Sequence, residues 1–232
     1  MLINSINIKS FNAKLLTVDI QTQELSNSSE WLDNSLSPLF LANKKQFKKI
    51  DLEIAFKGAS RTEILNNISN FMSKLINEVI LTLDKYDHKY KVILKENSTE
   101  KTISKNLYKK KLSFIGYEFS DEVIENLDRI TTKTINVAGN LLTPATVEIT
   151  PSIDIIDLQI NGLSNDSIII KNLHANKKII INSEDATVLE EGANKFIDTD
   201  MWEFPFLSPG ANKIKISKNN CNIKIKYRPR YI

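Results

Sequence analysis

Two kinds of hydrophobic pattern divide the chain. Up to about residue 137, short runs of alternating apolar and polar residues surround one stretch with helical spacing; beyond it only alternating runs remain. A period of two is typical of strands that bury one face, whereas apolar residues three and four apart form a stripe along a helix. The pattern predicts a mainly β protein, with an α+β domain at 1–138 and an all-β domain at 139–232.

The one convincing helix is expected over residues 61–78. Ser60 stands at the N-cap position and Glu63 follows three residues later, a capping-box pattern that satisfies two otherwise unpaired backbone donors. Apolar residues then recur at three- and four-residue spacings: Ile64, Leu65, Ile68, Phe71, Met72, Leu75, Ile76 and Val79. Such a stripe is typical of a helix that covers one face of a sheet, and it does not indicate a cofactor site.

Alternating runs predict strands on both sides of this helix. They lie at 2–8, 13–21 and 50–56 before it, and at 79–84, 90–95, 112–119 and 130–137 after it. The runs at 79–84 and 90–95 are expected to form a hairpin. Residues 96–110 are polar and rich in lysine, Lys109–Lys111 are interpreted as a solvated flank, and residues 120–128 are expected to form a short turn of helix.

Residues 22–49 lack periodicity and are expected to form a long loop. A structureless loop of this length is uncommon in a compact domain and is usually functional or disordered. Trp31 has two interpretations, an anchor folded onto its own domain or an anchor into a neighbouring subunit. Trp31 and Pro38 are therefore candidate subunit-interface residues, and deletion of residues 24–46 would test them. The lysines of this stretch are interpreted as a solvated face.

The second half of the chain consists of short strands separated by turn signals. Alternating runs occur at 145–149, 155–160, 167–170, 177–181 and 187–189, at the spacing of an all-β sandwich. Near the C-terminus, Pro205 indicates an extended segment that does not lie within a sheet. Two further runs, 212–217 and 222–228, are expected to form an antiparallel hairpin with one dry and one wet face.

This C-terminal stretch resembles the distal tail protein family of phage tails. The residues that carry the resemblance, within the last 31 of the chain, are Trp202, Phe204, Pro205, Leu207, Pro209, Gly210, Asn212, Ile214, Tyr227, Pro229, Arg230 and Tyr231. The resemblance implies an N-terminal tail-tube-like β-sandwich flanked by one α-helix and a C-terminal galectin-like β-sandwich. It also implies a non-enzymatic structural protein of the virion tail tip, assembled in the host cytoplasm.

The resemblance further implies particular partners. Family members form a homohexameric ring that continues the tail tube, leaves a lumen for DNA, and connects to the central hub, or tail-associated protein, and to receptor-binding proteins. A closed ring needs a heterologous interface, and sheet edges together with residues 22–49 could supply one. The remaining alternatives are a carbohydrate-binding module that contacts host glycans and a wall-degrading glycosidase. Against the glycosidase, the Phe and Pro neighbours of Trp202 favour a buried anchor over a sugar platform. Against glycan contact, the sequence shows no cluster of exposed aromatic residues with polar partners.

Composition and potential catalytic residues change this interpretation little. The 31 basic and 28 acidic residues are interspersed, so a net charge of +3 does not indicate a membrane or a sequence-specific nucleic-acid partner. No apolar run approaches the length of a membrane span, and a single cysteine excludes an internal disulfide. His88, His174 and Cys221 fall in separate predicted turns or strand ends, so neither a metal site nor nucleophilic catalysis is expected. We expect no cofactor, and we interpret the acidic pairs near residues 184, 190 and 198 as solvated.

Overall fold

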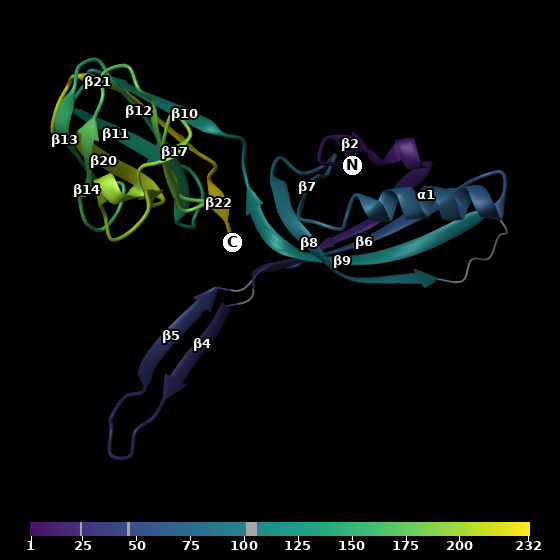
Figure 1. Ribbon diagram of the computed structural model, residues 1–232. Coiled ribbons are helices and arrows are strands. Elements are labelled where there is room, and N and C mark those ends of the chain that lie inside the picture. The colour runs from purple at the N-terminus through teal and green to yellow at the C-terminus, as the bar shows by residue number, and fades with distance from the viewer. Residues whose placement is uncertain (24, 46, 101–105) are drawn as a thin grey trace. The chain divides into compact units, whose positions relative to one another are not determined.

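The computed structural model describes residues 1–23, 25–45, 47–100 and 106–232 and divides into two compact units (Figure 1). The N-terminal unit comprises Met1–Phe119 together with Ile232, and the C-terminal unit comprises Ser120–Tyr231. The predicted fold class is confirmed, because both units are built of antiparallel strands and the described residues contain one α-helix.

The N-terminal unit is organised around one curved antiparallel sheet in the order β2-β1-β7-β8-β9-β6-β3. Its strands are β1 (Leu2–Ile3), β2 (Ile6–Asn7), β3 (Ala13–Ile20), β6 (Lys48–Lys57), β7 (Val79–Thr82), β8 (Lys89–Glu100) and β9 (Leu107–Phe119), with the 3-10 helix η1 (Ile8–Phe11) between β2 and β3. The predicted hairpin over 79–95 is confirmed as the β7–β8 pair.

The predicted solvated flank at Lys109–Lys111 is wrong for its middle residue, because all three lysines lie in β9 and Lys110 is buried. Residues 101–105 of the preceding polar stretch lie outside the described residues. Residues 96–100 continue β8 and residues 107–110 begin β9, and the two segments pair with each other. Lys110 points to the core side of the sheet and donates from Nζ to Asn97 Oδ1 at 2.9 Å. Burial lowers the pKa of Lys110.

Helix α1 (Arg61–Ser73) covers one face of this sheet (Figure 1). Glu63 N–H donates to Ser60 Oγ at 3.2 Å, and the Glu63 carboxylate accepts from Ala59 N–H at 2.8 Å, so the capping interaction reaches one residue further back than predicted. Buried Phe71 meets Phe56 edge-on, with ring centroids 5.2 Å apart. The helix ends five residues before the predicted position because its last turn closes through 3-10-type hydrogen bonds to the Phe71 and Met72 carbonyls.

The predicted loop at 22–49 instead contains a hairpin. Strands β4 (Leu25–Glu30) and β5 (Leu39–Lys45) pair antiparallel, with Glu30 opposite Leu39 and a register shift between Ser28 and Ser29. Within the described residues these two strands pair only with each other. The hairpin residues whose burial is described, 28–41, contribute to neither hydrophobic core, and the sequence of the hairpin shows none of the alternation by which the other strands were predicted.

The C-terminal unit is a sandwich of two antiparallel sheets. One sheet has the order β10-β21-β12-β15-β16-β17, with β19 paired to β12, and the other has the order β11-β20-β13-β14-β18. The first sheet contains β10 (Val123–Asp128), β12 (Thr143–Pro151), β15 (Ile179–Asn182), β16 (Thr187–Glu190), β17 (Ala193–Asn194), β19 (Phe206–Leu207) and β21 (Cys221–Tyr227). The second contains β11 (Thr132–Val137), β13 (Ile155–Asn161), β14 (Ile168–Leu173), β18 (Thr199–Asp200) and β20 (Gly210–Ile216); η2 (Phe196–Asp198) and β22 (Arg230–Tyr231) complete the described elements. The inner faces bury a continuous core of aliphatic side chains.

The division between the units falls after Phe119, whereas the change of hydrophobic pattern placed it near residue 138. The difference arises from strands β10 and β11, which the sequence assigned to the first half as a helical turn and a strand. Strand β10 pairs with β21, and β11 pairs with β20, so both complete the sandwich of the C-terminal unit. The hydrophobic pattern predicted a sandwich from residue 139 onward. It could not show that the earlier strands β10 and β11 would pair with the edges of that sandwich.

The predicted C-terminal hairpin is also corrected. Strands β20 and β21 have the expected dry faces, with Ile214 and Ile216 buried on one and Ile223 and Ile225 buried on the other. They lie in opposite sheets, however, because β20 pairs with β11 and β13 while β21 pairs with β10 and β12. The polar turn between them therefore crosses from one sheet to the other.

Candidate assembly surface

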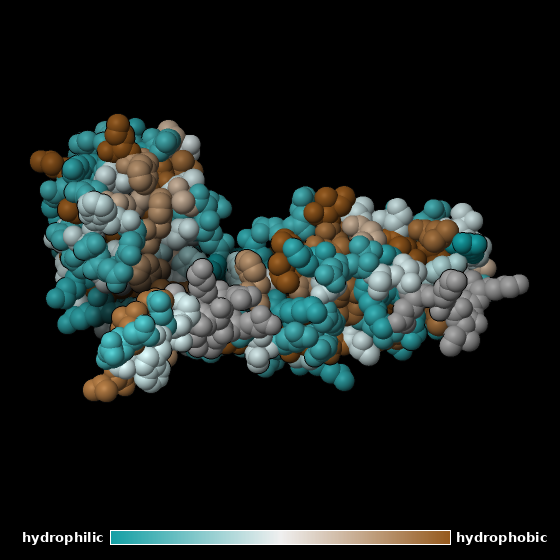
Figure 2. Space-filling model, turned by 90° about the horizontal axis from the view of Figure 1, so that it is seen from below, coloured by the Kyte–Doolittle hydropathy of each residue, from teal (hydrophilic) through white to brown (hydrophobic). Residues whose placement is uncertain are grey.

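The free end of the β4–β5 hairpin exposes an unusual number of large apolar side chains. Trp31 is 64% exposed, Phe40 is 82% exposed and Leu36 is fully exposed at 100%. Leu32, Leu39 and Leu41 are also exposed, and hydrophobic atoms are visible on the hairpin in Figure 2. A concentration of exposed apolar side chains often marks an interaction site in a soluble protein. We refer to residues 31–41 as the hairpin tip.

Hydrogen bonds within the hairpin tip give it a defined shape. Trp31 Nε1 donates to the Ser35 carbonyl at 3.0 Å, and Ser35 N–H donates to the Leu32 carbonyl at 3.0 Å. Ser35 Oγ donates to the Ser37 carbonyl at 2.7 Å, and Asn34 has a positive φ of 69°, a conformation that asparagine tolerates well. The hydrogen bond from Nε1 therefore orients the Trp31 indole, while most of the surface of this side chain remains exposed to solvent.

This geometry bears on the two interpretations of Trp31. Its hydrogen bond is local to the hairpin, and its largely exposed ring does not match an anchor buried in its own domain. Pro38 is half-buried next to the exposed Leu39. Both residues thus remain candidates for a subunit interface.

A charged cluster lies where the chain returns from the hairpin to the sheet. Lys48, the first residue of β6, is buried and forms an ion pair with Glu118 of β9. The second carboxylate oxygen of Glu118 lies 2.5 Å from His88 Nδ1. A buried lysine is costly unless its charge is paired, so the Glu118 carboxylate offsets the cost of burying Lys48 at this end of the β6–β9 pair.

The sheet face opposite α1 is polar. Alternate residues of β3, β6 and β9 present Thr17, Asp51, Glu53 and Ser113 around a shallow pocket, which Asp19 and Lys111 also line. Asp19 and Asp51 lie directly opposite each other in the β3–β6 pair. The Lys49 ammonium, 3.3 Å from Asp51, offsets part of the repulsion between these two carboxylates.

Most of the C-terminal motif residues build the sandwich. Pro205, Leu207, Tyr227 and Pro229 are buried, and Phe204 packs partly buried against the core and stacks on Phe196 at a centroid distance of 6.1 Å. The Pro205 carbonyl accepts from Ala145 N–H at 3.0 Å, which continues the pairing of β19 with β12. The resemblance in this region is thus carried largely by residues that fix the fold.

Asn212 organises the turn that contains Pro209 and Gly210. Its Oδ1 accepts from Ser208 N–H at 2.9 Å, while its Nδ2 donates to the Ser208 and Gly210 carbonyls at 2.7 and 3.0 Å. Gly210 has a positive φ of 89°, which glycine adopts without strain. Because a side-chain amide both donates and accepts hydrogen bonds, Asn212 can bond to backbone N–H and C=O groups of the same turn.

The end of the chain is tied down by backbone and side-chain bonds. The Arg230 carbonyl accepts from Asn140 N–H at 3.1 Å, and the Arg230 guanidinium pairs with Glu184 at 3.2 Å. A Cβ added to Gly139 would lie 2.4 Å from the Arg230 carbonyl oxygen, so only glycine allows this approach. Tyr231 is half-buried.

Trp202 corrects a prediction. Its neighbours indicated a buried anchor, yet its side chain is 86% exposed. Phe204 takes the core position instead, because the backbone bends at residues 202 and 203, so that Trp202 and Phe204 do not share a face. Glu203, the next residue along the chain, accepts from the side-chain amide of Asn165 at 2.9 and 3.1 Å and from its backbone N–H at 3.2 Å. Trp202 is therefore held on a well-supported segment.

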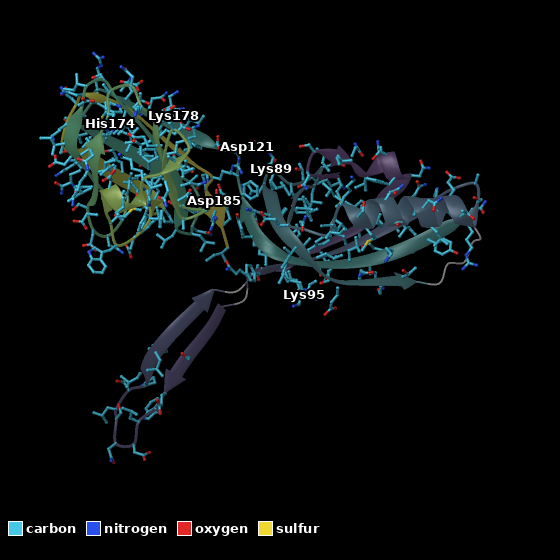
Figure 3. The ribbon with its side chains drawn as sticks, in the orientation of Figure 1. Lys89, Lys95, Asp121, His174, Lys178 and Asp185 are labelled. Carbon is cyan, nitrogen blue, oxygen red and sulfur yellow. The ribbon has the colours of Figure 1, made fainter. Side chains whose placement is uncertain are left out.

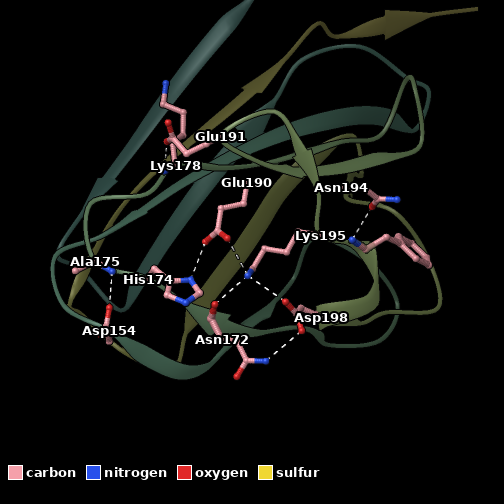
Figure 4. A network of polar contacts seen from close by, with 11 residues as sticks. Asp154, Asn172, His174, Ala175, Lys178, Glu190, Glu191, Asn194, Lys195 and Asp198 are labelled. Atoms are coloured by element: carbon pink, nitrogen blue, oxygen red, sulfur yellow. Dashed lines mark hydrogen bonds and ion pairs between the residues drawn. The ribbon is translucent and has the colours of Figure 1, made fainter.

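A polar network in the C-terminal unit engages the acids near residues 190 and 198 (Figure 4). Buried Lys195 pairs with Glu190 at 3.3 Å and with Asp198 at 3.2 Å, and it donates to the Asn172 carbonyl at 2.9 Å. Burial opposes ionisation of Glu190, but hydrogen bonds from His174 and Lys195 outweigh it and lower its pKa. Hydrogen bonds from Asn172 and Lys195 lower the pKa of Asp198. These acids are structural ion-pair partners and not the solvated residues that the sequence indicated.

The structure does not bring the histidines and the cysteine together. His88 belongs to the N-terminal unit, and His174 and Cys221 to the C-terminal unit, where Figure 3 labels His174. His174 pairs with Glu190, and burial raises the pKa of the Cys221 thiol, which disfavours a reactive thiolate. Within the described ranges, no group of three or more potential ligands could hold a metal ion. The same residues include no helix with the length and apolar character needed to cross a membrane.

Comparison with known proteins supports the resemblance to phage tail components. Residues 138–231 match the family model of the siphovirus-type tail component, C-terminal domain. The fold of the whole chain matches the crystal structure of the SPP1 Dit protein with a TM-score of 0.80 and 8% identity, covering 100% of this chain and 98% of that one. Over residues 138–231 the chain thus matches a phage tail-component family, and its whole fold is that of a distal tail protein. The resemblance that the C-terminal motif carried is confirmed, and the motif lies inside the matched region.

Two phage baseplate structures share the fold at lower similarity. Chains of the phage P2 baseplate in its activated conformation, with Ca and with Sr, match with TM-scores of 0.58 and 0.57 at 12% and 13% identity. These matches cover 96% and 95% of this chain and 92% of each baseplate chain. Among curated proteins, none matches this chain in sequence. The SPP1 protein is described as a paradigm of the hub adsorption apparatus in phages that infect Gram-positive bacteria.

Proposed function

We propose that this distal tail protein forms a closed homohexameric ring at the tip of a phage tail and acts there as a non-enzymatic structural component. The observation that carries the proposal is the hairpin tip, whose apolar side chains are exposed in the single chain. Burial of a large apolar side chain contributes about 1.5–3 kcal/mol. Several such side chains on one projecting element would stabilise an interface between subunits.

The ring would place the two units in different roles. The N-terminal unit would continue the tail tube, and its polar sheet face around Asp19 and Asp51 is suited to a wet lumen through which DNA passes. The C-terminal sandwich would face the other partners. These partners are the central hub or tail-associated protein and the receptor-binding protein, in a virion assembled in the host cytoplasm.

Solution mass together with negative-stain images of the purified chain tests the proposal. Closed rings with a central hole and about six times the 26.4 kDa chain mass are expected, because a heterologous interface that closes on rotation gives a ring. A compact two-fold dimer that uses the hairpin tip would contradict the proposal. So would a monomer that persists at high concentration and binds a saccharide.

A second candidate function, contact with host glycans, is favoured by one observation. Trp202 was expected to be buried but presents its indole to solvent, and the adjacent residue Glu203 forms a hydrogen bond with the Asn165 amide. An exposed aromatic ring can stack on the apolar face of a sugar while amides and carboxylates bond its hydroxyl groups. This would be a carbohydrate-binding role of the C-terminal unit.

Tryptophan fluorescence separates this second candidate from the first. The chain has two tryptophans, so Trp31→Phe leaves Trp202 as the single reporter and Trp202→Phe leaves Trp31. Titration with lactose, N-acetylglucosamine oligomers and soluble teichoic acid should change the emission of the Trp31→Phe protein only. An unchanged spectrum with every saccharide, in a protein that still assembles, would reject the glycan role and leave the ring proposal intact.

A further inference from the structure

We propose that one outer face of the C-terminal sandwich binds an anionic polymer in which phosphate groups alternate with hydroxyl-bearing units, such as poly(glycerol phosphate). The inference goes beyond the proposed ring and rests on it only for the number of copies that one particle presents. The face is the outer side of the sheet β11-β20-β13-β14-β18. We refer to its central residues as the lysine face: Lys213 and Lys215 of β20, Thr132 and Thr134 of β11, and Asn161 of β13.

Alternation along β20 places both lysines on the outer side of the sheet. Ile214 and Ile216 are buried in the core of the sandwich, whereas Lys213 and Lys215 are exposed. Residues two apart in a strand are separated by about 6.4–6.8 Å, so the two side chains stand in a row along the strand. Strand β20 lies between β11 and β13, so the lysines lie within the sheet and not at its edge. This geometry suits successive charges of an extended chain.

The residues beside these lysines in the neighbouring strands are polar and uncharged. Thr134 lies opposite Lys213 in the β11–β20 pair. Thr132 and Asn161 lie on either side of Lys215, one in β11 and the other in β13. Hydroxyl and amide side chains donate to and accept from hydroxyl groups, and they donate to phosphate oxygens. The lysine face therefore combines two cations with groups that can bond a polyol.

The two charges are not neutralised within the chain. In the part of the chain that the structure describes, neither Lys213 nor Lys215 forms an ion pair or a side-chain hydrogen bond. Asp157 on the neighbouring strand β13 is already paired with Lys218 at 2.5 Å. Asp200 lies on β18, with β13 and β14 between it and β20. An anion on the lysine face thus meets two uncompensated positive charges.

The opposite sheet provides an internal comparison, because β21 carries the same alternation of lysine and isoleucine. There, Lys226 pairs with Glu148 at 2.5 Å, and Lys224 lies directly opposite Glu148 in the β12–β21 pair. One carboxylate thus offsets the lysines of β21, whereas threonines and an asparagine lie opposite Lys213 and Lys215. The two strands share a sequence pattern, but their neighbours leave uncompensated charge on β20.

The chemistry of the lysine face favours a polyol or sugar phosphate over nucleic acid. Proteins that bind single strands combine a basic surface with aromatic side chains on which bases stack. On the lysine face, threonine and asparagine occupy the positions next to the lysines instead. Single exposed ion pairs contribute little, so one chain would bind the polymer weakly. Several copies in one ring would bind the same polymer with higher avidity.

The test compares two double variants in binding to immobilised poly(glycerol phosphate) by biolayer interferometry. Lys213→Gln with Lys215→Gln removes both charges of the lysine face, and Lys177→Gln with Lys224→Gln removes two exposed charges elsewhere in the same unit. At low salt the first should bind at least about tenfold more weakly than the parent chain, and the second should lose less than about twofold. The slope of log K against log salt should also fall by about 1.4 in the first variant alone, since each phosphate neutralised on a single strand contributes about 0.7.

Circular dichroism and light scattering on every variant distinguish loss of the lysine face from loss of fold or assembly. Equal binding by the two double variants would overturn the assignment and leave the ring proposal intact. Parent chains that bind the polymer through these lysines but form no rings would contradict the ring and not the lysine face. Polyglutamate and single-stranded DNA of matched charge should bind at least severalfold more weakly than the polymer. Equal affinity for either would show a general attraction to anions and would overturn the proposal.

Discussion

Trp31 Nε1 donates a hydrogen bond to the carbonyl oxygen of Ser35, 3.0 Å away across the turn of the hairpin. The bond satisfies the one polar atom of the indole and leaves its apolar ring in solvent. A tryptophan oriented in this way is pre-organised for burial by a partner, since less side-chain freedom remains to be lost on binding. We therefore expect Trp31 to contribute to the association of subunits through the hairpin tip.

Replacement of Trp31 should therefore affect assembly and not folding. Trp31→Ser is expected to weaken association at least tenfold, because tryptophan is prominent among residues that dominate binding energy. The free energy of unfolding should change by less than about 0.5 kcal/mol, as for other exposed positions. Light scattering over a concentration series and urea unfolding measure the two effects.

Trp31→Phe separates the ring from its hydrogen bond. It retains an apolar ring but loses the bond to Ser35, so it should associate more strongly than Trp31→Ser and less strongly than the parent chain. If both variants associate like the parent chain, Trp31 lies outside the interface.

The fold was predictable wherever one face of a strand or helix meets a core. Ile214, Ile216, Ile223 and Ile225 were placed correctly on dry faces because a period of two marks burial. The partner of each strand was not predictable, because alternation is the same whether two strands pair with each other or face each other across a core. Hence β20 and β21 were predicted as a hairpin but lie in opposite sheets.

The candidate interface was predictable only as a position in the sequence. The lack of periodicity at 22–49 indicated a special segment, and Trp31 indicated an anchor, but a hairpin without a core leaves no pattern by which its strands can be recognised. Exposure of Trp202 was missed because neighbouring aromatic residues do not show which of them turns inward.

Removal of the Glu118 charge should destabilise the N-terminal unit. Glu118→Gln leaves buried Lys48 without its carboxylate, and the loss of one partner from a buried pair costs about 3 kcal/mol or more. Urea unfolding followed by circular dichroism measures the change. Glu78→Gln, which removes an exposed pair with Lys91, is the control and should cost less than about 1 kcal/mol. Equal effects of the two substitutions would show that the Lys48–Glu118 pair is not structurally important.

Stability of the C-terminal unit should depend on pH through Glu148. A hydrogen bond from Lys226, 2.5 Å away, outweighs the effect of burial and lowers the pKa of Glu148 below 4.5. A carboxyl group with a lowered pKa in the folded state stabilises the protein above the unfolded value of 4.5, and this contribution is lost as the pH falls through the folded value. Stability should thus fall as the pH drops below about 4.5.

The variant Glu148→Gln isolates this contribution. It should lower the melting temperature at pH 7 and show a smaller further decrease between pH 5 and pH 3 than the parent chain shows. Glu122→Gln, which removes one carboxylate from an exposed pair with Arg228, controls for the change of net charge. An unchanged pH dependence in Glu148→Gln would assign the effect to other carboxylates.

Two glycines with similar backbone angles should respond differently to alanine. Gly162 and Gly210 have φ values of 90° and 89°, so alanine is strained at either position by about 1 kcal/mol. An added Cβ at Gly162 would also lie 2.3 Å from the Lys213 carbonyl oxygen, whereas at Gly210 it meets nothing within 4 Å. Gly162→Ala should therefore cost at least about 2 kcal/mol, twice the cost of Gly210→Ala. Thermal unfolding of the two variants checks the order, and a reversed order would contradict it.

The solution mass of the full chain beside that of a chain lacking residues 24–46 tests the central claim most directly. Light scattering on both proteins at matched concentrations should show closed assemblies of about six times the 26.4 kDa chain mass for the full chain. The shortened chain should remain folded, as judged by circular dichroism, and run as a monomer. Assemblies of the same mass from both proteins would contradict the claim that the hairpin joins the subunits.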